Sequence, residues 1–241
     1  MSDQPFSYMN RQLLLDVVPV PAPTWANFVV GVNAQAWTAA RELSPGRALY
    51  VWGSAGCGRT HLLKAVANGE DAIYIDAQAP TAVLHNLAHP EPGHHTPRVI
   101  AVDDVHCLDD DRQAALFALY NRWRESAATS SAFALIIAGD RSALAMPIRE
   151  DLRTRLGWDL VFRLEPLTDH DKLAALTAQA QDRQLTVAPE VVQWMLTHHE
   201  RDIRRLSALL DALDRYSLAT RRPITIPLLR TMLADPNAPS T

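Results

Sequence analysis

A group of glycines followed by a basic residue and a hydroxyl lies between the apolar run 48–52 and a second apolar stretch. This order predicts a strand, a phosphate-binding loop and a helix, because glycines let successive N–H groups turn towards an anion and the start of a helix adds its own donors. We expect this loop to bind the phosphates of a nucleotide, with Thr60 as a ligand of Mg²⁺. The expected binding residues are Gly53, Ser54, Ala55, Gly56, Cys57, Gly58, Arg59, Thr60 and His61.

The basic residue of such a loop is usually a lysine, but here it is Arg59. The planar guanidinium prefers bidentate pairing with one phosphate group and would crowd a terminal phosphate in a tight loop. The arginine therefore favours ADP over ATP and a weak ATPase activity in the chain's own site. Composition offers another explanation, because Lys64 and Lys172 are the only lysines among 23 basic residues, which leaves 23 − 2 = 21 arginines.

Acidic residues follow two further apolar runs. Asp103 and Asp104 come after residues 98–102, and Asp140 comes shortly after residues 133–138. The carboxyl ends of parallel strands gather at one edge of a sheet, so these side chains are expected beside the phosphate loop. Asp103 is then expected to orient the water shell of Mg²⁺, and Asp104 takes the place of a water-activating acid that is usually a glutamate. Asp140 is a candidate sensor of the terminal phosphate or of the attacking water.

Composition is that of an ordinary globular protein. The 241 residues are 48% hydrophobic and 21% charged, with a net charge of −4 and two cysteines. The acidic balance gives no field that would draw the chain onto DNA or an anionic membrane. No long apolar run or basic, apolar leader is present, so we expect a cytoplasmic protein that does not bind membranes.

The pattern of apolar residues predicts two folded domains and two tails: a flexible tail over residues 1–24, an α/β domain over 25–165, a helical domain over 166–235, and a disordered tail over 236–241. In the α/β domain we expect strands at 48–52, 72–76, 98–102, 133–138 and 160–164, and Asn33 is expected to cap the first helix. Helices are expected at 169–183, 189–199, 202–220 and 226–234 in the second domain, with Thr168 and Asp171 as a capping pair.

An apolar cluster lies in the N-terminal tail. Its notable residues are Gln12, Leu13, Leu15 and Val17. Two interpretations are open: an edge strand packed on the chain's own domain, or a linear motif that docks in an apolar pocket of a partner with Gln12 as its polar anchor.

A phosphate loop, an acidic strand end, a polar residue after the fourth strand and a helical domain carrying an arginine together resemble an AAA+ ATPase. The segments 28–31, 102–105 and 139–141 resemble the nucleotide-binding module of the replication initiator DnaA. The arginine variant of the loop, the tail motif and the lack of room for a DNA-binding domain resemble the Hda family of DnaA-related regulators. The resemblance extends from about residue 12 to residue 233.

This resemblance implies an AAA+ domain with a five-stranded parallel sheet, followed by a small α-helical lid. It implies an ADP-bound regulator that stimulates ATP hydrolysis by DnaA and so prevents re-initiation. Arg155 would be an arginine finger acting in trans, and Arg204 would contact the nucleotide from the lid. Residues 12–17 would bind the sliding clamp, the beta subunit of DNA polymerase III.

Under this interpretation the protein reaches DNA only through DnaA and the sliding clamp. The sequence leaves open whether the protein forms a homodimer. The main alternative is an autonomous AAA+ ATPase of the helicase-loader type, which would share the same core. A module that only scaffolds is a second alternative. Whether the chain itself is an enzyme is therefore undecided by the sequence.

Overall fold

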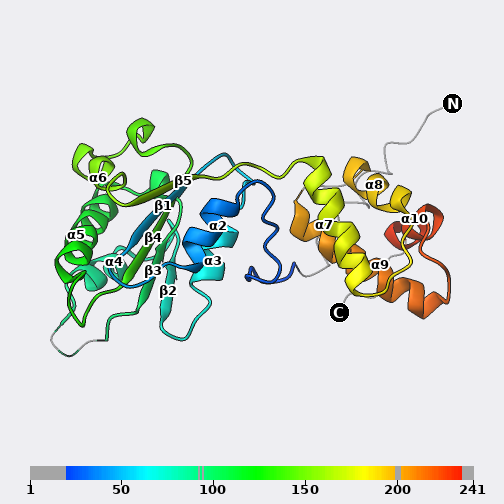
Figure 1. Cartoon of the computed structure of the whole chain (residues 1–241), viewed down its shortest axis with the longest axis horizontal. Helices are drawn as coiled ribbons and strands as arrows, with labels where there is room; N and C mark the ends of the chain where they lie inside the picture. The colour runs from blue at the N-terminus through cyan, green and yellow to red at the C-terminus, as the bar shows by residue number, and fades with distance from the viewer. Residues whose placement is uncertain (1–19, 92, 94, 199–201, 235–241) are drawn as a thin grey trace. The chain divides into compact units, whose positions relative to one another are not determined.

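The computed structural model describes residues 20–91, 93, 95–198 and 202–234 (Figure 1). The chain divides between Pro166 and Leu167 into two compact units. The first unit spans Pro23–Pro166, and the second contains the described residues from Leu167 onward.

The first unit is built on a five-stranded sheet in which every pairing is parallel, in the order β2-β3-β4-β1-β5. This confirms the predicted fold class. The central strands are almost entirely buried because helices cover both faces of the sheet. The strands are β1 (Ala48–Trp52), β2 (Ala72–Ile75), β3 (Val99–Val102), β4 (Ala134–Gly139) and β5 (Leu160–Arg163).

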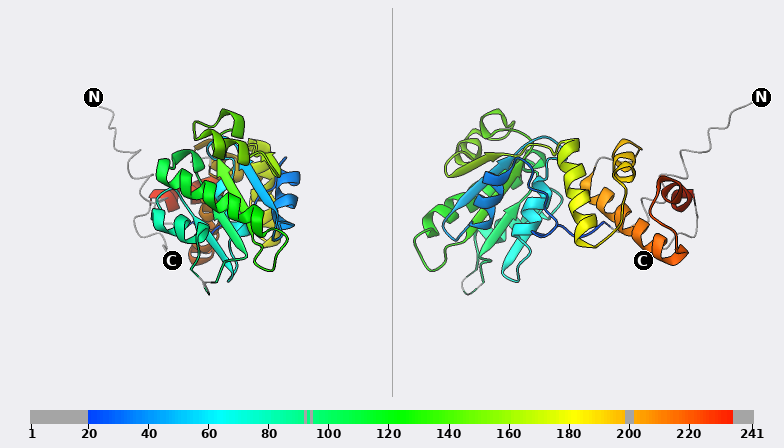
Figure 2. Two further views of the ribbon diagram at one scale, coloured as in Figure 1. Left: turned by 90° about the vertical axis from the view of Figure 1, so that its left-hand side faces the viewer. Right: turned by 45° about the vertical axis from the view of Figure 1, so that its right-hand side comes forward.

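Helices cover the two faces of this sheet (Figure 2), and side chains between the helices and the sheet form two separate apolar cores. One core packs α2 (Ala34–Arg41) and α3 (Arg59–Val66) against the sheet. The other packs α4 (Thr81–Ala88), α5 (Asp110–Ser126) and α6 (Glu150–Arg155) against the opposite face. The alternation of side chains along each strand supplies both cores, since neighbouring residues of a strand point to opposite faces. Short 3₁₀ turns lie at Val105–Cys107 and Ala143–Ala145.

Asn33 is the N-cap residue of α2, as predicted, but its side chain makes no capping hydrogen bond. Instead its amide oxygen accepts from the backbone N–H of Glu165 at 2.8 Å, and its amide nitrogen donates to the Glu165 carbonyl at 2.9 Å. The buried Asn33 side chain therefore holds the chain just after β5, 132 residues away in sequence.

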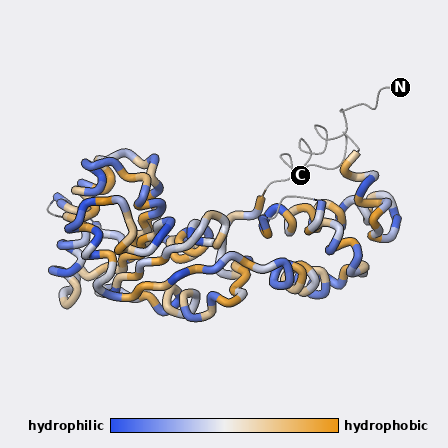
Figure 3. The backbone as a smooth tube through the Cα atoms, turned by 90° about the horizontal axis from the view of Figure 1, so that it is seen from above, coloured by the Kyte–Doolittle hydropathy of each residue, from blue (hydrophilic) through white to orange (hydrophobic). Residues whose placement is uncertain are grey.

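The second unit consists of four described helices around one apolar core. Hydrophobic and hydrophilic residues are interspersed along its helices (Figure 3), as expected of amphipathic helices. Thr168 and Asp171 form the predicted capping box at the first helix. The helices are α7 (Asp169–Asp182), α8 (Pro189–His198), α9 (Ile203–Thr220) and α10 (Ile226–Ala234). Within the described part of the chain, no helix is both long and apolar enough to cross a bilayer.

Candidate nucleotide site

The glycine-rich loop joins β1 to α3, and its backbone depends on glycine at specific positions. Gly56 and Gly58 have φ angles of 77° and 102°, which side-chain-bearing residues rarely adopt. A Cβ atom on Gly53 would lie 2.3 Å from the carbonyl oxygen of Leu164, so the start of the loop passes directly against the backbone after β5.

The start of α3 offers backbone donors at the end of this loop. The first helical hydrogen bond runs from the Leu62 N–H to the Gly58 carbonyl at 2.9 Å. The N–H groups of Arg59 and Thr60 therefore lie in the first turn, where no preceding helical carbonyl can accept from them. Together with the exposed loop residues before them, these donors fit a phosphate group.

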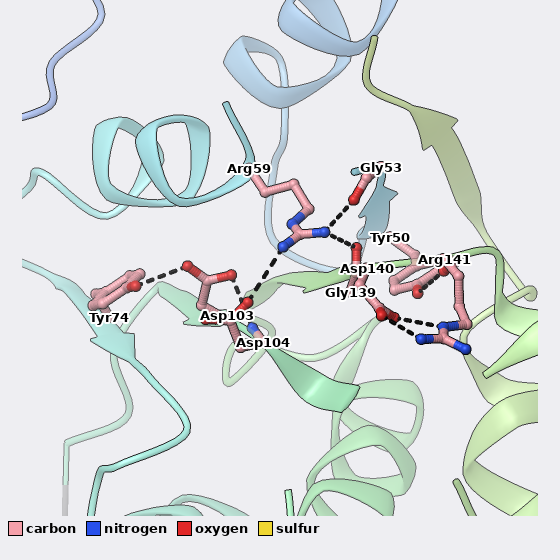
Figure 4. A network of polar contacts seen from close by, with 9 residues as sticks. All are labelled: Tyr50, Gly53, Arg59, Tyr74, Asp103, Asp104, Gly139, Asp140 and Arg141. Carbon is pink, nitrogen blue, oxygen red and sulfur yellow. Dashed lines mark hydrogen bonds and ion pairs between the residues drawn. The ribbon is translucent and has the colours of Figure 1, made fainter. Parts of the chain in front are cut away.

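The side chain of Arg59 turns inward, towards the ends of the strands (Figure 4). Its Nη1 atom contacts the carbonyl oxygen of Gly53 and lies 3.0 Å from that of Gly139, while Nη2 lies 3.5 Å from Asp104 Oδ1. Only 11% of the Arg59 side chain is exposed. The basic residue of the loop thus joins β1, β4 and the acidic end of β3.

Asp103 is fully buried at the end of β3, and both of its carboxylate oxygens accept hydrogen bonds. The Tyr74 hydroxyl donates to Oδ2 at 2.8 Å, and the Asp104 N–H donates to Oδ1 at 2.8 Å. Burial first, and the charge of Asp103 second, raise the pKa of Tyr74, so the phenol remains a donor over the ordinary pH range.

Asp104 differs from its neighbour in exposure and in backbone conformation. It is partly exposed and takes a left-handed φ of 48°, which is uncommon for a residue with a side chain. Burial and the nearby charge of Asp103 raise the pKa of Asp104. Asp103 and Asp104 are neighbours in the sequence, but Asp103 is fully buried and Asp104 is partly exposed. These different surroundings are compatible with different roles for the two carboxylates.

The residues expected to hold Mg²⁺ are compatible with the way that ion binds. No described cluster of three His, Cys, Asp or Glu side chains could hold a metal by itself. Mg²⁺ at nucleotide sites usually takes only one or two protein ligands and completes its shell with water and phosphate oxygens. Thr60 in the first turn of α3 and Asp103 at the end of β3 supply that number.

Asp140 follows β4, one residue beyond the carbonyl that contacts Arg59. Its carboxylate is bound by the Arg141 guanidinium at 2.8 and 2.6 Å. This hydrogen bonding lowers the pKa of Asp140, so the carboxylate stays charged. The Tyr50 hydroxyl donates to the Arg141 carbonyl at 2.6 Å, which ties the turn to β1.

Two of the predicted loop residues have packed side chains. Cys57 is buried, and this burial raises the pKa of its thiol. The buried His61 ring lies edge-on to Phe28 at 5.1 Å, and its Nε2 atom is 2.9 Å from the Thr24 carbonyl. The helix after the loop thereby contacts the segment that begins the first unit.

Arg155 is the last residue of α6 and lies against aromatic rings. Its guanidinium carbon is 3.7 Å from the centre of the Trp158 ring and 5.2 Å from that of Phe117. Among the described residues, no carboxylate forms an ion pair with Arg155, and neither a hydrogen bond nor an ion pair joins its side chain to the phosphate loop. Its charge is therefore not neutralised within the described part of the chain.

Arg204 belongs to the second unit, at the second position of α9. Its guanidinium binds the carboxylate of Asp202 at 2.9 Å, and Asp202 also accepts from the Arg204 N–H as the N-cap of that helix. Burial opposes ionisation of Asp202, but these hydrogen bonds lower its pKa overall. The predicted partner-binding residues Gln12, Leu13, Leu15 and Val17 lie outside the described residues.

Comparison with known proteins gives a family for this chain. The model of the Hda lid domain matches residues 169–233. An uncharacterized protein of Haemophilus influenzae is 32% identical over 240 residues, which cover 93% of this chain and 99% of the relative. The chain belongs to the Hda-like family of DnaA-related proteins.

Solved structures agree with this family on the fold. Domain III of the DnaA protein from Thermotoga maritima has a TM-score of 0.64 and 23% identity, over 92% of this chain and all of that chain. AMPPCP-bound DnaA from Aquifex aeolicus has a TM-score of 0.60 and 21% identity, over 80% of this chain and 65% of that chain. This chain therefore has the AAA+ architecture of DnaA, with a helical lid domain after the α/β unit.

Sequence reasoning missed three residues at or near the candidate sites. Tyr74 binds the buried Asp103, the Gly139 carbonyl accepts from Arg59, and Trp158 stacks on Arg155. Trp158 stands three residues after Arg155, and this short spacing was a signal available in the sequence. Tyr74 and Gly139 are distant from their partners in sequence and carried no such signal.

Proposed function

We propose that this protein is a cytoplasmic, ADP-bound regulator of replication initiation that stimulates hydrolysis of the ATP bound to DnaA. Membership of the Hda-like family supports the link to replication and to DnaA. In this proposal the chain supplies Arg155 to the partner's site, and the chemistry takes place there.

The observation that supports the proposal is the environment of the Arg155 guanidinium. Its guanidinium lies 3.7 Å from the centre of the Trp158 ring and has no ion pair among the described residues. When water attacks the terminal phosphorus of ATP and the bond to ADP breaks, negative charge develops on the phosphate oxygens. An arginine finger that stabilises this charge is typically worth a factor of about 10³–10⁵ in rate.

The chain's own nucleotide has a positioning role in this proposal. The loop 53–60 and the first turn of α3 would bind the phosphates of ADP. Thr60 and Asp103 would hold Mg²⁺, which would supply positive charge to the phosphates. Arg204, which lies in the stretch matched by the family's lid domain, would contact the nucleotide.

The N-terminal tail anchors the regulator in this proposal. Residues 12–17 bind the sliding clamp, the beta subunit of DNA polymerase III, so that the chain reaches DNA only through its partners. The net charge of −4 supports an indirect association with DNA.

An autonomous ATPase of the helicase-loader type is the second candidate. It is favoured by the assembly of Arg59, Asp103 and Asp140 at the strand ends of one chain. It is opposed by Asp104, whose carboxylate lies 3.5 Å from the Arg59 guanidinium. This contact occupies one oxygen of the Asp104 carboxylate, and aspartate is one methylene shorter than the glutamate usual at this position, so the carboxylate is poorly placed to activate an attacking water.

The deciding experiment measures hydrolysis of radiolabelled ATP bound to DnaA, with DNA-loaded clamp and ADP present. Wild-type protein is compared with Arg155→Ala and with Arg149→Ala as a control, because Arg149 is paired with Asp151 at 2.8 Å. We expect stimulation by the wild type and by Arg149→Ala, and its loss in Arg155→Ala. Full stimulation by Arg155→Ala, or turnover of ATP by the chain alone at the same rate, would overturn the proposal.

A further inference from the structure

Trp158 is a partly exposed aromatic residue that lies beside two arginines. Its exposed fraction is 41%, so part of the side chain is open to solvent. The guanidinium carbons of Arg155 and Arg124 lie 3.7 and 4.4 Å from the centre of its ring. A cation near the face of a tryptophan is attracted by the negative potential of the ring.

The backbone on both sides of Trp158 is firmly held. Its N–H donates to the Arg155 carbonyl at 3.0 Å, which forms a turn directly after α6. The next residue, Asp159, accepts from the Arg47 guanidinium at 2.9 and 2.7 Å and from the Ala48 N–H at 2.8 Å. The backbone that carries the Trp158 ring is therefore tied on one side to the end of α6 and on the other to the start of β1.

The ring is also supported by its neighbours on α5. The buried Tyr120 meets it edge-on, with ring centres 6.2 Å apart. Phe117, one turn earlier on α5, faces the Arg155 guanidinium from 5.2 Å. Aromatic rings therefore form a platform for Arg155, and this platform consists of Trp158, Phe117 and Tyr120.

This way of holding an arginine leaves its charge in place. A carboxylate partner would neutralise the guanidinium and would have to be displaced by an incoming phosphate. No described carboxylate forms an ion pair with either Arg124 or Arg155, whereas Arg47, Arg141 and Arg149 each have one. A stacked guanidinium keeps its N–H groups, which lie in the plane of the fork, available for phosphate oxygens.

We propose that Trp158 is a positioning residue for Arg155, which holds the guanidinium in the orientation that meets the terminal phosphate of a partner's ATP. This inference rests on the function proposed above. Trp158 itself does not touch the nucleotide. Its contribution is preorganisation, since an arginine that is already ordered loses less side-chain entropy when it binds the phosphate.

The test compares Trp158→Leu, which removes the ring, with Trp158→Phe, which keeps a smaller one. Leu144→Ala is the control, because Leu144 is 88% exposed in the 3₁₀ turn before α6. Stimulated ATP hydrolysis is measured against regulator concentration to give a maximal rate and a half-saturating concentration. Circular dichroism and thermal unfolding establish that each variant is folded.

We expect Trp158→Leu to lower the maximal rate about twofold to fivefold, the factor that corresponds to an exposed cation–π contact. Trp158→Phe should recover part of this loss, and the half-saturating concentration should stay the same. The double variant Arg155→Ala, Trp158→Leu should behave as Arg155→Ala alone. A change in half-saturating concentration with an unchanged maximal rate would instead make Trp158 a docking residue and overturn the proposal.

A second measurement needs no partner. The ¹⁵Nε–¹Hε resonance of Arg155 reports the motion of the guanidinium in the isolated chain, and we expect it to become more mobile in Trp158→Leu but not in Leu144→Ala. Unchanged mobility would overturn the positioning role even if the rate falls. Full stimulation by Arg155→Ala would refute the proposed function, whereas loss with Arg155→Ala and none with Trp158→Leu would refute the positioning role alone.

Discussion

The Arg59 guanidinium lies 3.0 Å from the carbonyl oxygen of Gly139, which ends β4 80 residues further along the chain. The same guanidinium contacts the Gly53 carbonyl and lies 3.5 Å from Asp104. A basic residue that already has three oxygen partners is constrained in how far it can reach towards a phosphate. The contacts of Arg59 therefore bear directly on which nucleotide the loop prefers.

Replacement of Arg59 by lysine should weaken the preference for ADP over ATP. The ammonium is smaller than the guanidinium and carries fewer donors, so it leaves more space for a terminal phosphate. Calorimetric titration of the purified chain with each nucleotide, in the presence of Mg²⁺, measures the ratio of the two affinities. We expect this ratio to fall about tenfold, which corresponds to a free-energy change near the size of one charged hydrogen bond.

An arginine elsewhere provides the matched control for this substitution. Arg112→Lys changes an arginine of α5 that pairs with Asp109, the N-cap residue of that helix, so the nucleotide ratio should not change. An unaltered ratio in Arg59→Lys as well would mean that the arginine reflects the composition of the chain and not the chemistry of the loop.

Tyr74→Phe should destabilise the first unit by about 1.5–3 kcal/mol, because the buried Asp103 carboxylate loses a donor. Tyr50→Phe is the matched comparison, since its hydroxyl donates to the neutral carbonyl of Arg141 and its loss should cost about 1 kcal/mol. Urea unfolding of both variants measures the free energies. Equal costs would show that the charge on Asp103 adds nothing to the hydrogen bond with Tyr74.

Asn33→Ala should cost about 2–3 kcal/mol in the free energy of unfolding, because the N–H and the carbonyl of Glu165 both lose their partner. The exposed Asn86 on α4 serves as the control, and its replacement by alanine should change stability by less than about 0.5 kcal/mol. A small effect at Asn33 would imply that water replaces both hydrogen bonds.

Asp159 should make stability depend on pH in the acid range. The hydrogen bond from Arg47, opposed in part by burial, holds the pKa of Asp159 below its ordinary value of 3.8. The folded state thus favours the charged carboxylate, so this contribution is complete above pH 3.8 and is lost as the pH falls through the lower folded-state pKa. Asp159→Asn should lower stability by about 1 kcal/mol at pH 7 and flatten the acid loss. Urea unfolding of the wild type and of Asp159→Asn at pH 7 and pH 3 tests this prediction. An equal loss of unfolding free energy between the two pH values in both proteins would contradict it.

Much of the fold could be predicted from local patterns in the sequence. The Thr168–Asp171 capping box was predictable because the two residues stand three positions apart and interact within one helical turn. The strand ends that bring Asp103 and Asp140 to the phosphate loop were predictable because parallel strands end at one edge of the sheet. In each case the relevant partner is either close in sequence or placed by a general rule of sheet topology.

Interactions between distant residues escaped prediction. The Asn33 side chain binds Glu165 and not the start of its own helix, because folding brings a backbone N–H and carbonyl within reach from 132 residues away. The inward direction of Arg59 likewise depends on where the end of β4 lies in space. Residue type predicted a cation at that position, but only the three-dimensional arrangement of strand ends determines which oxygens it meets.

The Asn33–Glu165 pair has a mechanical consequence for the C-terminal end of the first unit. Glu165 is held by two hydrogen bonds to Asn33, and the capping box begins three residues later at Thr168. Between them stand Pro166, whose ring restricts its φ angle, and Leu167. The first unit is therefore fastened at Glu165, one residue before it ends, so unravelling of the chain from Leu167 would stop there before it reached β5.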